Sequence, residues 1–425
     1  MSTNGDGQRS GDGRRIGLIV LGASFVGHAG NYLYYVIAAR MVSPPTFAAI
    51  SALIAFGTIA MMPINGIQLA VARDVAVLRT SGTAGALSAY LRRLGRRMWV
   101  TCLGLFVLIS ALSPVLADRL HIGSAFPVIL AAVWIATSAL LIVLTGVTQG
   151  MERFGYVSFA LAGPLGMVRA LVLPLCLLAA GLAGSMWAMI VATLIGLVVM
   201  IRPAVQDARI TPAAAPPMPS MLVTIVALLA FSALINLDLL VAQATLAPAD
   251  RAHYAGAALL GKIAFYAPAA LALVLLPRAS AALERGERAE SAVLKTIALT
   301  AGCGFAVAAV LWAMPTSVLT TTFGPAYAAA KPLLAPLALV MTAAAVLWVH
   351  LTFATAKRSR RMTVGLVMTA VAHGLLLAFL HGSPQQIILA SAIALWGSLV
   401  VIEIGSGSGI VRMMLARAPK ALVSH

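Results

Sequence analysis

The chain has 425 residues, of which 61% are hydrophobic and 10% charged, and its formal net charge is +17. Soluble domains average about half apolar and a quarter charged residues, and a soluble chain of this size cannot hide so much apolar surface from water. The basic residues stand in short runs between apolar segments, which excludes the basic face of a nucleic-acid-binding protein. The sequence therefore predicts an all-α polytopic membrane protein.

A glycine- and arginine-rich stretch over 1–15 comes first and predicts a disordered cytoplasmic tail. Apolar segments follow, each long enough for a membrane helix of about 20 residues. The fifth and sixth are separated only by a tight turn at Gly181–Gly184. The twelve predicted spans cover 16–39, 46–71, 98–117, 126–147, 156–180, 183–201, 221–247, 252–276, 292–314, 331–353, 362–381 and 386–404.

The connections between these spans differ in positive charge, and this bias predicts their orientation. With the N-terminus in the cytoplasm, most arginines fall in the inner connections. The outer connections then hold only Arg40, Arg119, Arg251 and Lys331. We therefore expect a multi-pass protein of the plasma (inner) membrane with both termini cytoplasmic.

A proline-rich segment over 202–220 cannot be helical throughout, and it predicts a cytoplasmic linker between two halves. The halves are an N-terminal six-helix lobe over 16–201 and a C-terminal six-helix lobe over 221–404, and a cytoplasmic tail over 405–425 follows. Six helices is an even number, so both halves share one orientation and an axis along the membrane normal should relate them. An internal repeat supports this division, because Asn31, Pro63, Arg73 and Arg153 recur at one constant offset as Asn236, Pro268, Arg278 and Arg358.

Several short segments, in this order and at these places, resemble bacterial polysaccharide transporters and oligosaccharide-lipid flippases. This family belongs to the multidrug/oligosaccharidyl-lipid/polysaccharide flippase superfamily. The resemblance implies two six-helix lobes around a central cavity, alternating access, and export of lipid-linked or polymeric sugars. The segments are Gln149-Gly150-Met151-Glu152-Arg153-Phe154, Asn236-Leu237-Asp238, Tyr254-Ala255-Gly256, Leu260-Gly261-Lys262, Leu276-Pro277-Arg278 and Phe323-Gly324-Pro325-Ala326-Tyr327.

Lipid II flippases of this family carry arginines in the first helix, whereas the first span here holds His28 and Asn31. These two residues share one helix face and are candidates either for the cavity or for hydrogen bonds between helices. His28 can also carry a proton near neutral pH. Gly27 and Gly30 on the same turn permit close approach of a neighbouring helix or a ligand.

Three charged residues lie deep inside predicted spans, where a charge costs about 2.5–3.5 kcal/mol on insertion scales. Asp238 and Lys262 lie at matching depths on consecutive spans and can pair across that hairpin, either as a structural salt bridge or as cavity residues with Asn236. Arg169 either binds phosphate groups of the cargo or clamps onto backbone carbonyls.

Further candidates lie at helix ends and at helix breaks. Arg73, Arg153 and Arg278 stand at inner helix ends, where they set topology, contact anionic membrane lipid, or form with Gln149 an inner gate that admits phosphate groups. Pro63 and Pro268 interrupt repeat-related helices and are candidate hinges for rocking of the lobes.

The function predicted from these features is a non-enzymatic flippase or exporter of a lipid-linked or polymeric saccharide. The expected partners are that cargo, anionic lipid, and glycosyltransferases or a polymerase of the same pathway. No cofactor is expected, and coupling to protons or to sodium stays open. One alternative is a cation-coupled drug antiporter of the same superfamily. The other is a non-transporting component or a membrane enzyme of polysaccharide synthesis.

Overall fold

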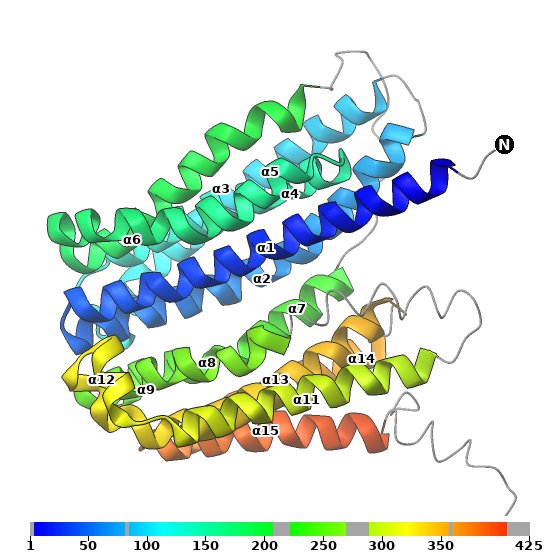
Figure 1. Cartoon of the computed structure of the whole chain (residues 1–425). Coiled ribbons are helices and arrows are strands. Elements are labelled where there is room, and N and C mark those ends of the chain that lie inside the picture. Colours follow the sequence, from blue (N-terminus) through cyan, green and yellow to red (C-terminus); the bar gives the residue numbers. More distant parts are fainter. Residues whose placement is uncertain (1–3, 81–84, 207–221, 269–288, 357–359, 406–425) are drawn as a thin grey trace, which may run out of the picture. The chain divides into compact units, whose positions relative to one another are not determined.

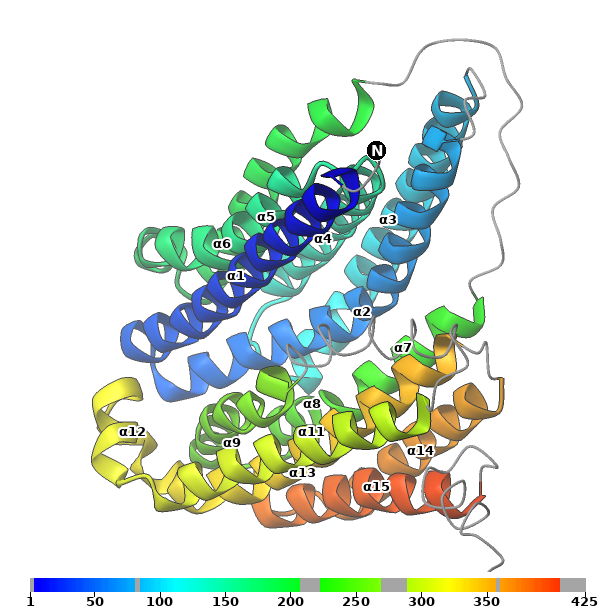
Figure 2. The same cartoon turned by 45° about the vertical axis from the view of Figure 1, so that its right-hand side comes forward.

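The structure, a computed structural model, describes residues 4–80, 85–206, 222–268, 289–356 and 360–405. These segments are helical almost throughout and divide into two compact units, Met1–Ile225 and Val226–His425. Figures 1 and 2 show each unit as a bundle of helices packed along their lengths, blue to green in the first and green to red in the second.

Within the described residues, eight helices are long and apolar enough to cross a membrane, or nine if one bent pair counts as a single span. Large apolar side chains lie exposed along their outer faces. On the third helix, for example, Trp99, Leu103 and Val107 are 65%, 52% and 56% exposed. Such a surface suits lipid tails and not water. The prediction of an all-α polytopic membrane protein is confirmed.

The N-terminal unit contains the first six predicted spans. Each predicted range from 16–39 to 183–201 falls within helical structure. The elements are α1 (Asn4–Met41), α2 (Pro44–Thr80), α3 (Ala86–Arg119), α4 (Phe126–Gly150), α5 (Phe154–Ala162), a π-helix (Gly163–Met167) and α6 (Val168–Val205).

Two details of this unit bear on the sequence predictions. The stretch Phe154–Val205 has 52 residues, about 78 Å at 1.5 Å per residue, which is more than twice a bilayer core of about 30 Å. Its helix breaks at Ala180 and Gly181, with φ 52° at Gly181, so the predicted division into two spans is confirmed. By contrast, α1 begins at Asn4. The tail over 1–15, which the sequence predicted to be disordered, is therefore helical from Asn4 onward. No proline stands in this segment to interrupt the helix.

The C-terminal unit begins with a broken span. The helices α7 (Leu222–Leu234) and α8 (Leu237–Thr245) meet at an angle of 44°, although the sequence predicted one span over 221–247. The chain continues through α9 (Pro248–Gly261) and is helical again over 263–268, and the rest of the predicted eighth span lies outside the described residues.

The remaining spans match single helices. Between the ninth and tenth stands a short helix, α12, that the sequence did not predict. It ends at Phe323, and the next residue, Gly324, has a φ of 118°, a conformation that only glycine adopts readily. The elements are α11 (Ala289–Ala313), α12 (Thr316–Phe323), a 3-10 helix (Pro325–Ala330), α13 (Lys331–Ala356), α14 (Arg360–Phe379) and α15 (Pro384–Gly405).

Glycines bring α1 directly against the π-helix of the N-terminal unit. A Cβ atom on Gly30 would lie 2.6 Å from the backbone of Gly166 and Met167, and one on Gly27 would lie 2.5 Å from the Leu161 carbonyl oxygen. The prediction that these glycines permit close approach of a neighbouring helix is therefore confirmed. Such small-residue contacts are typical of membrane helix interfaces, and this one holds the segment that leads into Arg169.

Candidate functional site

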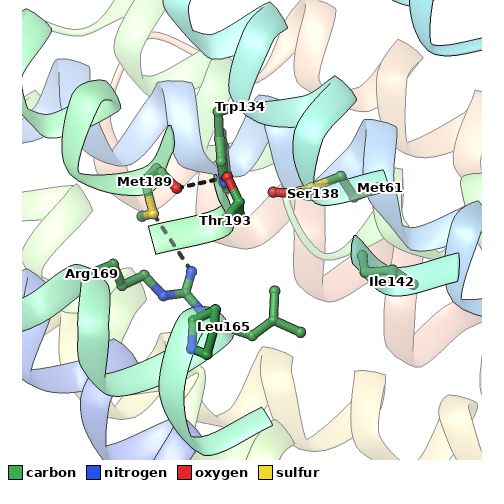
Figure 3. Close-up of a pocket in the computed structure, with 9 residues that line it drawn as sticks. Met61, Trp134, Ser138, Ile142, Leu165, Arg169, Met189 and Thr193 are labelled. Atoms are coloured by element: carbon green, nitrogen blue, oxygen red, sulfur yellow. Dashed lines mark hydrogen bonds between the residues drawn. The ribbon is translucent and has the colours of Figure 1, made fainter. Parts of the chain in front are cut away.

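A cavity of about 120 Å³ lies within the N-terminal unit. Residues of α2, α4, the π-helix and α6 line it (Figure 3), and its polar lining includes Ser138, Arg169 and Thr193. About 10–15 Å³ of such volume is needed to hold one water molecule, so the cavity has room for several. The cavity therefore has room for a small polar group.

Arg169 follows the π-helix directly and is the one charged residue of the cavity lining. Its guanidinium donates to the sulfur of Met189 at 3.6 Å, as Figure 3 shows. A thioether is a weak acceptor. Bulges of π-helix are frequent at functional sites, and this one sets the start of α6 and hence the position of Arg169.

Two hydroxyl groups and an indole complete the polar lining. Thr193 donates to the carbonyl of Met189 at 3.1 Å and lies 3.0 Å from the hydroxyl of Thr137. The hydroxyl of Ser138 is buried and has no hydrogen-bond partner among the described residues. Trp134 lies beside them in Figure 3. The cavity thus combines a cation with groups that can hydrogen-bond an anion.

The local charge of this unit is positive within the membrane. The sequence places no Asp or Glu in any of the six predicted spans of this half. His28 on α1 lies close enough to interact electrostatically with Arg169, which brings these two predicted site residues together. A site of this charge favours an anion over a cation.

A second polar cluster lies inside the C-terminal unit, at the break between α7 and α8. Asn236 and Asp238 are 2% and 1% exposed. The amide of Asn236 donates to the carbonyl of Ser232 at 2.9 Å and accepts from the ammonium of Lys262 at 2.6 Å. Asn236 thereby binds both a backbone carbonyl beside the helix break and the lysine.

The predicted pairing of Asp238 with Lys262 is wrong in its direct form. Lys262 hydrogen-bonds Asn236, whereas Asp238 accepts a hydrogen bond from the hydroxyl of Tyr254 at 2.7 Å. The helix break explains the difference, because it turns the amide of Asn236 toward Lys262 at the end of α9. The two charges still interact at longer range.

We expect Asn236→Ala to lower the free energy of unfolding by about 2–3 kcal/mol, because the ammonium of Lys262 loses its acceptor in a partly buried place. Lys262→Met removes that ammonium and should restore most of the lost stability when both changes are combined. Thermal unfolding in detergent of the wild type, Asn236→Ala, Lys262→Met and the double variant measures this coupling. If Asn236→Ala lowers the free energy of unfolding equally in the wild type and in Lys262→Met, the hydrogen bond between Lys262 and Asn236 is contradicted.

No protein-family model and no curated protein matches the sequence. The fold, however, matches solved structures over nearly its whole length. An inward-facing multidrug resistance MATE family transporter of the MOP superfamily has a TM-score of 0.67 at 13% identity, covering 96% of this chain and 100% of that one. The chain has the MOP-superfamily transporter fold. The fold that the sequence resemblance implies is thus confirmed.

Two other MOP structures extend this likeness. The lipid II flippase MurJ, in an inward closed conformation, has a TM-score of 0.66 at 11% identity, covering 91% of this chain and 86% of that one. A transporter from Pyrococcus furiosus, described by a reverse polarity of its binding pocket that suggests a different function, has a TM-score of 0.55 at 13% identity, covering 91% of this chain and 94% of that one. Proteins with this fold therefore include both multidrug transporters and a lipid flippase.

The predicted gate residues do not come together in the described part of this MOP fold. Arg153 donates to the carbonyl of Pro203, which ties the start of α5 to the end of α6. Gln149 accepts from the side chain of Gln68 at 3.4 Å, between α4 and α2. Arg73 is exposed beside Asp74, 3.4 Å away. Their role at a gate stays a prediction, and Arg278 lies outside the described residues.

The remaining candidates stay predictions in the same way. Pro63 is buried within α2, and Pro268 is buried at the last described residue of its segment. Asn31 is half-buried in the unbroken helix α1, whereas its repeat partner Asn236 stands at a helix break. The repeat positions are thus not equivalent in backbone shape.

Sequence reasoning missed several residues of both clusters. Trp134, Ser138, Met189 and Thr193 carry no local signal, because an apolar or hydroxyl residue in a membrane helix is ordinary. Their meeting at Arg169 depends on how α4 and α6 pack. Tyr254 stood in a segment of the family resemblance, yet only the structure joins its hydroxyl to Asp238.

Proposed function

We propose that this chain is a transporter that moves an anionic lipid-linked or polymeric saccharide across the membrane by alternating access. The observation that carries the proposal is the Arg169 cavity in a half whose predicted spans hold no carboxylate. Arginine recognises phosphate groups with paired hydrogen bonds. A phosphate- or pyrophosphate-linked sugar offers such groups together with a lipid tail.

The same charge distribution argues against the first alternative, a cation-coupled drug antiporter. Exchange of a cationic drug for protons uses carboxylates within the membrane. Here Asp238 is the only acid deep in a predicted span, since Glu403 stands near a helix end. A positive cavity around Arg169 repels a cationic drug, whereas it attracts an anionic cargo.

The cellular setting belongs to the same proposal. The excess of arginines in alternate connections supports a plasma (inner) membrane protein with both termini in the cytoplasm. A cargo of this kind is made by glycosyltransferases or a polymerase, which are the partners we infer for this transporter.

Reconstitution into liposomes tests the proposal. The purified protein is expected to move a fluorescent polyprenyl-pyrophosphate-linked oligosaccharide from the inner to the outer leaflet, measured by a membrane-impermeant quencher. Empty liposomes give the background rate. Accumulation of a cationic dye, with no movement of the saccharide, would support the antiporter in its place.

A further inference from the structure

Four arginines stand in the first turns of α3, and the first acid of this helix, Asp118, lies near its other end. Two of them, Arg92 and Arg96, are exposed and stand one turn apart on the same face. Like charges four residues apart on a helix repel each other. A bound anion would offset this repulsion. The four are Arg92, Arg93, Arg96 and Arg97.

The exposed pair differs from arginines nearby that bind groups of the protein itself. Arg79, at the end of α2, donates to the carbonyl of Met151 at 2.8 Å and pairs with Glu152 at 3.0 Å. By contrast, Arg92 and Arg96 make no hydrogen bond or ion pair with any residue that the structure describes. Their guanidinium groups are therefore available to an external anion.

An apolar strip continues the face of these arginines along α3. Trp99, Leu103 and Val107 follow at helical spacing and are 65%, 52% and 56% exposed. The helix as a whole is poorly covered by protein, since 22% of the residues in its most apolar stretch are buried, compared with 67% in α2 and in α4. The face thus joins a basic end to a surface that suits lipid tails.

The opposite face of α3 fixes the direction in which this strip points. Tyr90, Leu94 and Met98 belong to a buried core together with side chains of α2 and α4. At 100° per residue, Arg92 and Arg96 lie on the far side of the helix from these three. The basic strip therefore projects away from the core of its own unit.

The level of the arginines relative to the bilayer follows from Trp99. Tryptophan is enriched at the boundary between membrane and water. At 1.5 Å per residue, Arg96 stands about 4.5 Å and Arg92 about 10 Å further toward water. The layer of polar headgroups is about 5–8 Å thick on each side of the hydrocarbon core. Long arginine side chains reach across such distances, so both guanidinium groups can meet phosphate groups in this layer.

We propose that the face formed by Arg92, Arg96, Trp99, Leu103 and Val107 binds an anionic phospholipid. Each guanidinium donates paired hydrogen bonds to phosphate oxygens, and an acyl chain lies along Leu103 and Val107. A zwitterionic lipid fits less well, because its own cationic group is repelled by the two arginines. The inference goes beyond the proposed function and does not depend on it.

Quenching of tryptophan fluorescence tests this site in the purified full chain. The protein, in micelles of a neutral detergent, is titrated with phosphatidylglycerol that carries brominated acyl chains, and Trp99→Phe identifies the share of the quenching that comes from Trp99. Combining Arg92→Gln with Arg96→Gln is expected to raise the concentration for half-maximal quenching of Trp99 about 30-fold. One basic residue at an anionic membrane surface is worth about a factor of five.

The matched control combines Arg360→Gln with Arg361→Gln. It removes the same charge from two exposed arginines at the start of α14 and should leave the quenching of Trp99 unchanged. An equal effect of the two double variants would overturn the inference, because it would show attraction by overall charge only.

Three other results would also overturn it. The first is quenching of Trp99 by brominated phosphatidylcholine at the same concentration, which would leave only an apolar surface. The second is displacement of phosphatidylglycerol by far less polyprenyl pyrophosphate, which would assign the face to a cargo lipid. The third is a Trp99 that no brominated lipid quenches in a protein that sediments as a dimer, which would assign the face to a second copy of the chain.

Discussion

Replacing Arg169 by methionine is expected to lower the rate of saccharide translocation by about 10- to 100-fold. Hydrogen bonds to charged groups contribute about 1.5–3 kcal/mol, and each 1.4 kcal/mol corresponds to a factor of ten. Methionine keeps an unbranched apolar stem like that of arginine and lacks the guanidinium. The loss should therefore come from the charge. Initial rates in liposomes, at equal amounts of folded protein, measure it.

Two control variants sharpen this prediction. Arg169→Lys keeps the charge but not the paired donors, so it should retain an intermediate rate. Arg119→Met removes an exposed arginine at the end of α3 in the same unit and should leave the rate unchanged. A wild-type rate in Arg169→Met would show that Arg169 is a structural clamp onto the backbone and not a contact to the cargo.

A methyl group at Gly30 is expected to destabilise the N-terminal unit by about 1–3 kcal/mol or more, the usual effect of overpacking. The Cβ of Gly30→Ala would lie 2.6 Å from the backbone of Gly166 and Met167. Backbone atoms cannot rotate away as a flexible side chain can. Helix α1 must therefore move off the π-helix, and the cavity next to Arg169 changes shape. Both the midpoint of thermal unfolding and the translocation rate should fall.

Gly22 on the same helix provides the matched control, because a Cβ there would have no other atom within 4 Å. Gly22→Ala should keep or raise stability, since alanine is favoured over glycine within a helix by about 0.5–1 kcal/mol. If Gly30→Ala and Gly22→Ala unfold at the same temperature, α1 does not pack against the π-helix as closely as described.

The sequence predicted the spans well because a membrane helix is defined by the length of an apolar segment. It predicted even the turn at Gly181, where two spans follow each other without a charged loop. It did not predict the break before Asp238, because neither Gly nor Pro stands at Ile235 or Asn236. There the helix ends where the amide of Asn236 binds both Ser232 and Lys262.

The candidate sites, like the spans, could be predicted from the sequence only in part. The sequence gives the depth of a residue in the membrane, but not the direction in which its side chain points. Asp238 and Lys262 have matching depths, yet each binds another partner. Arg169 was identified because a single charge in an apolar span is visible without tertiary structure.

We propose that the cargo is an anionic saccharide lipid, recognised by its negative charge. The most direct measurement compares translocation by the wild-type protein of one lipid-linked oligosaccharide with a neutral, a phosphate or a pyrophosphate linkage. We expect the rate to rise with the negative charge of the linkage, and Arg169→Met to remove this dependence. Equal rates for the three linkages, or faster movement of the neutral one, would contradict it.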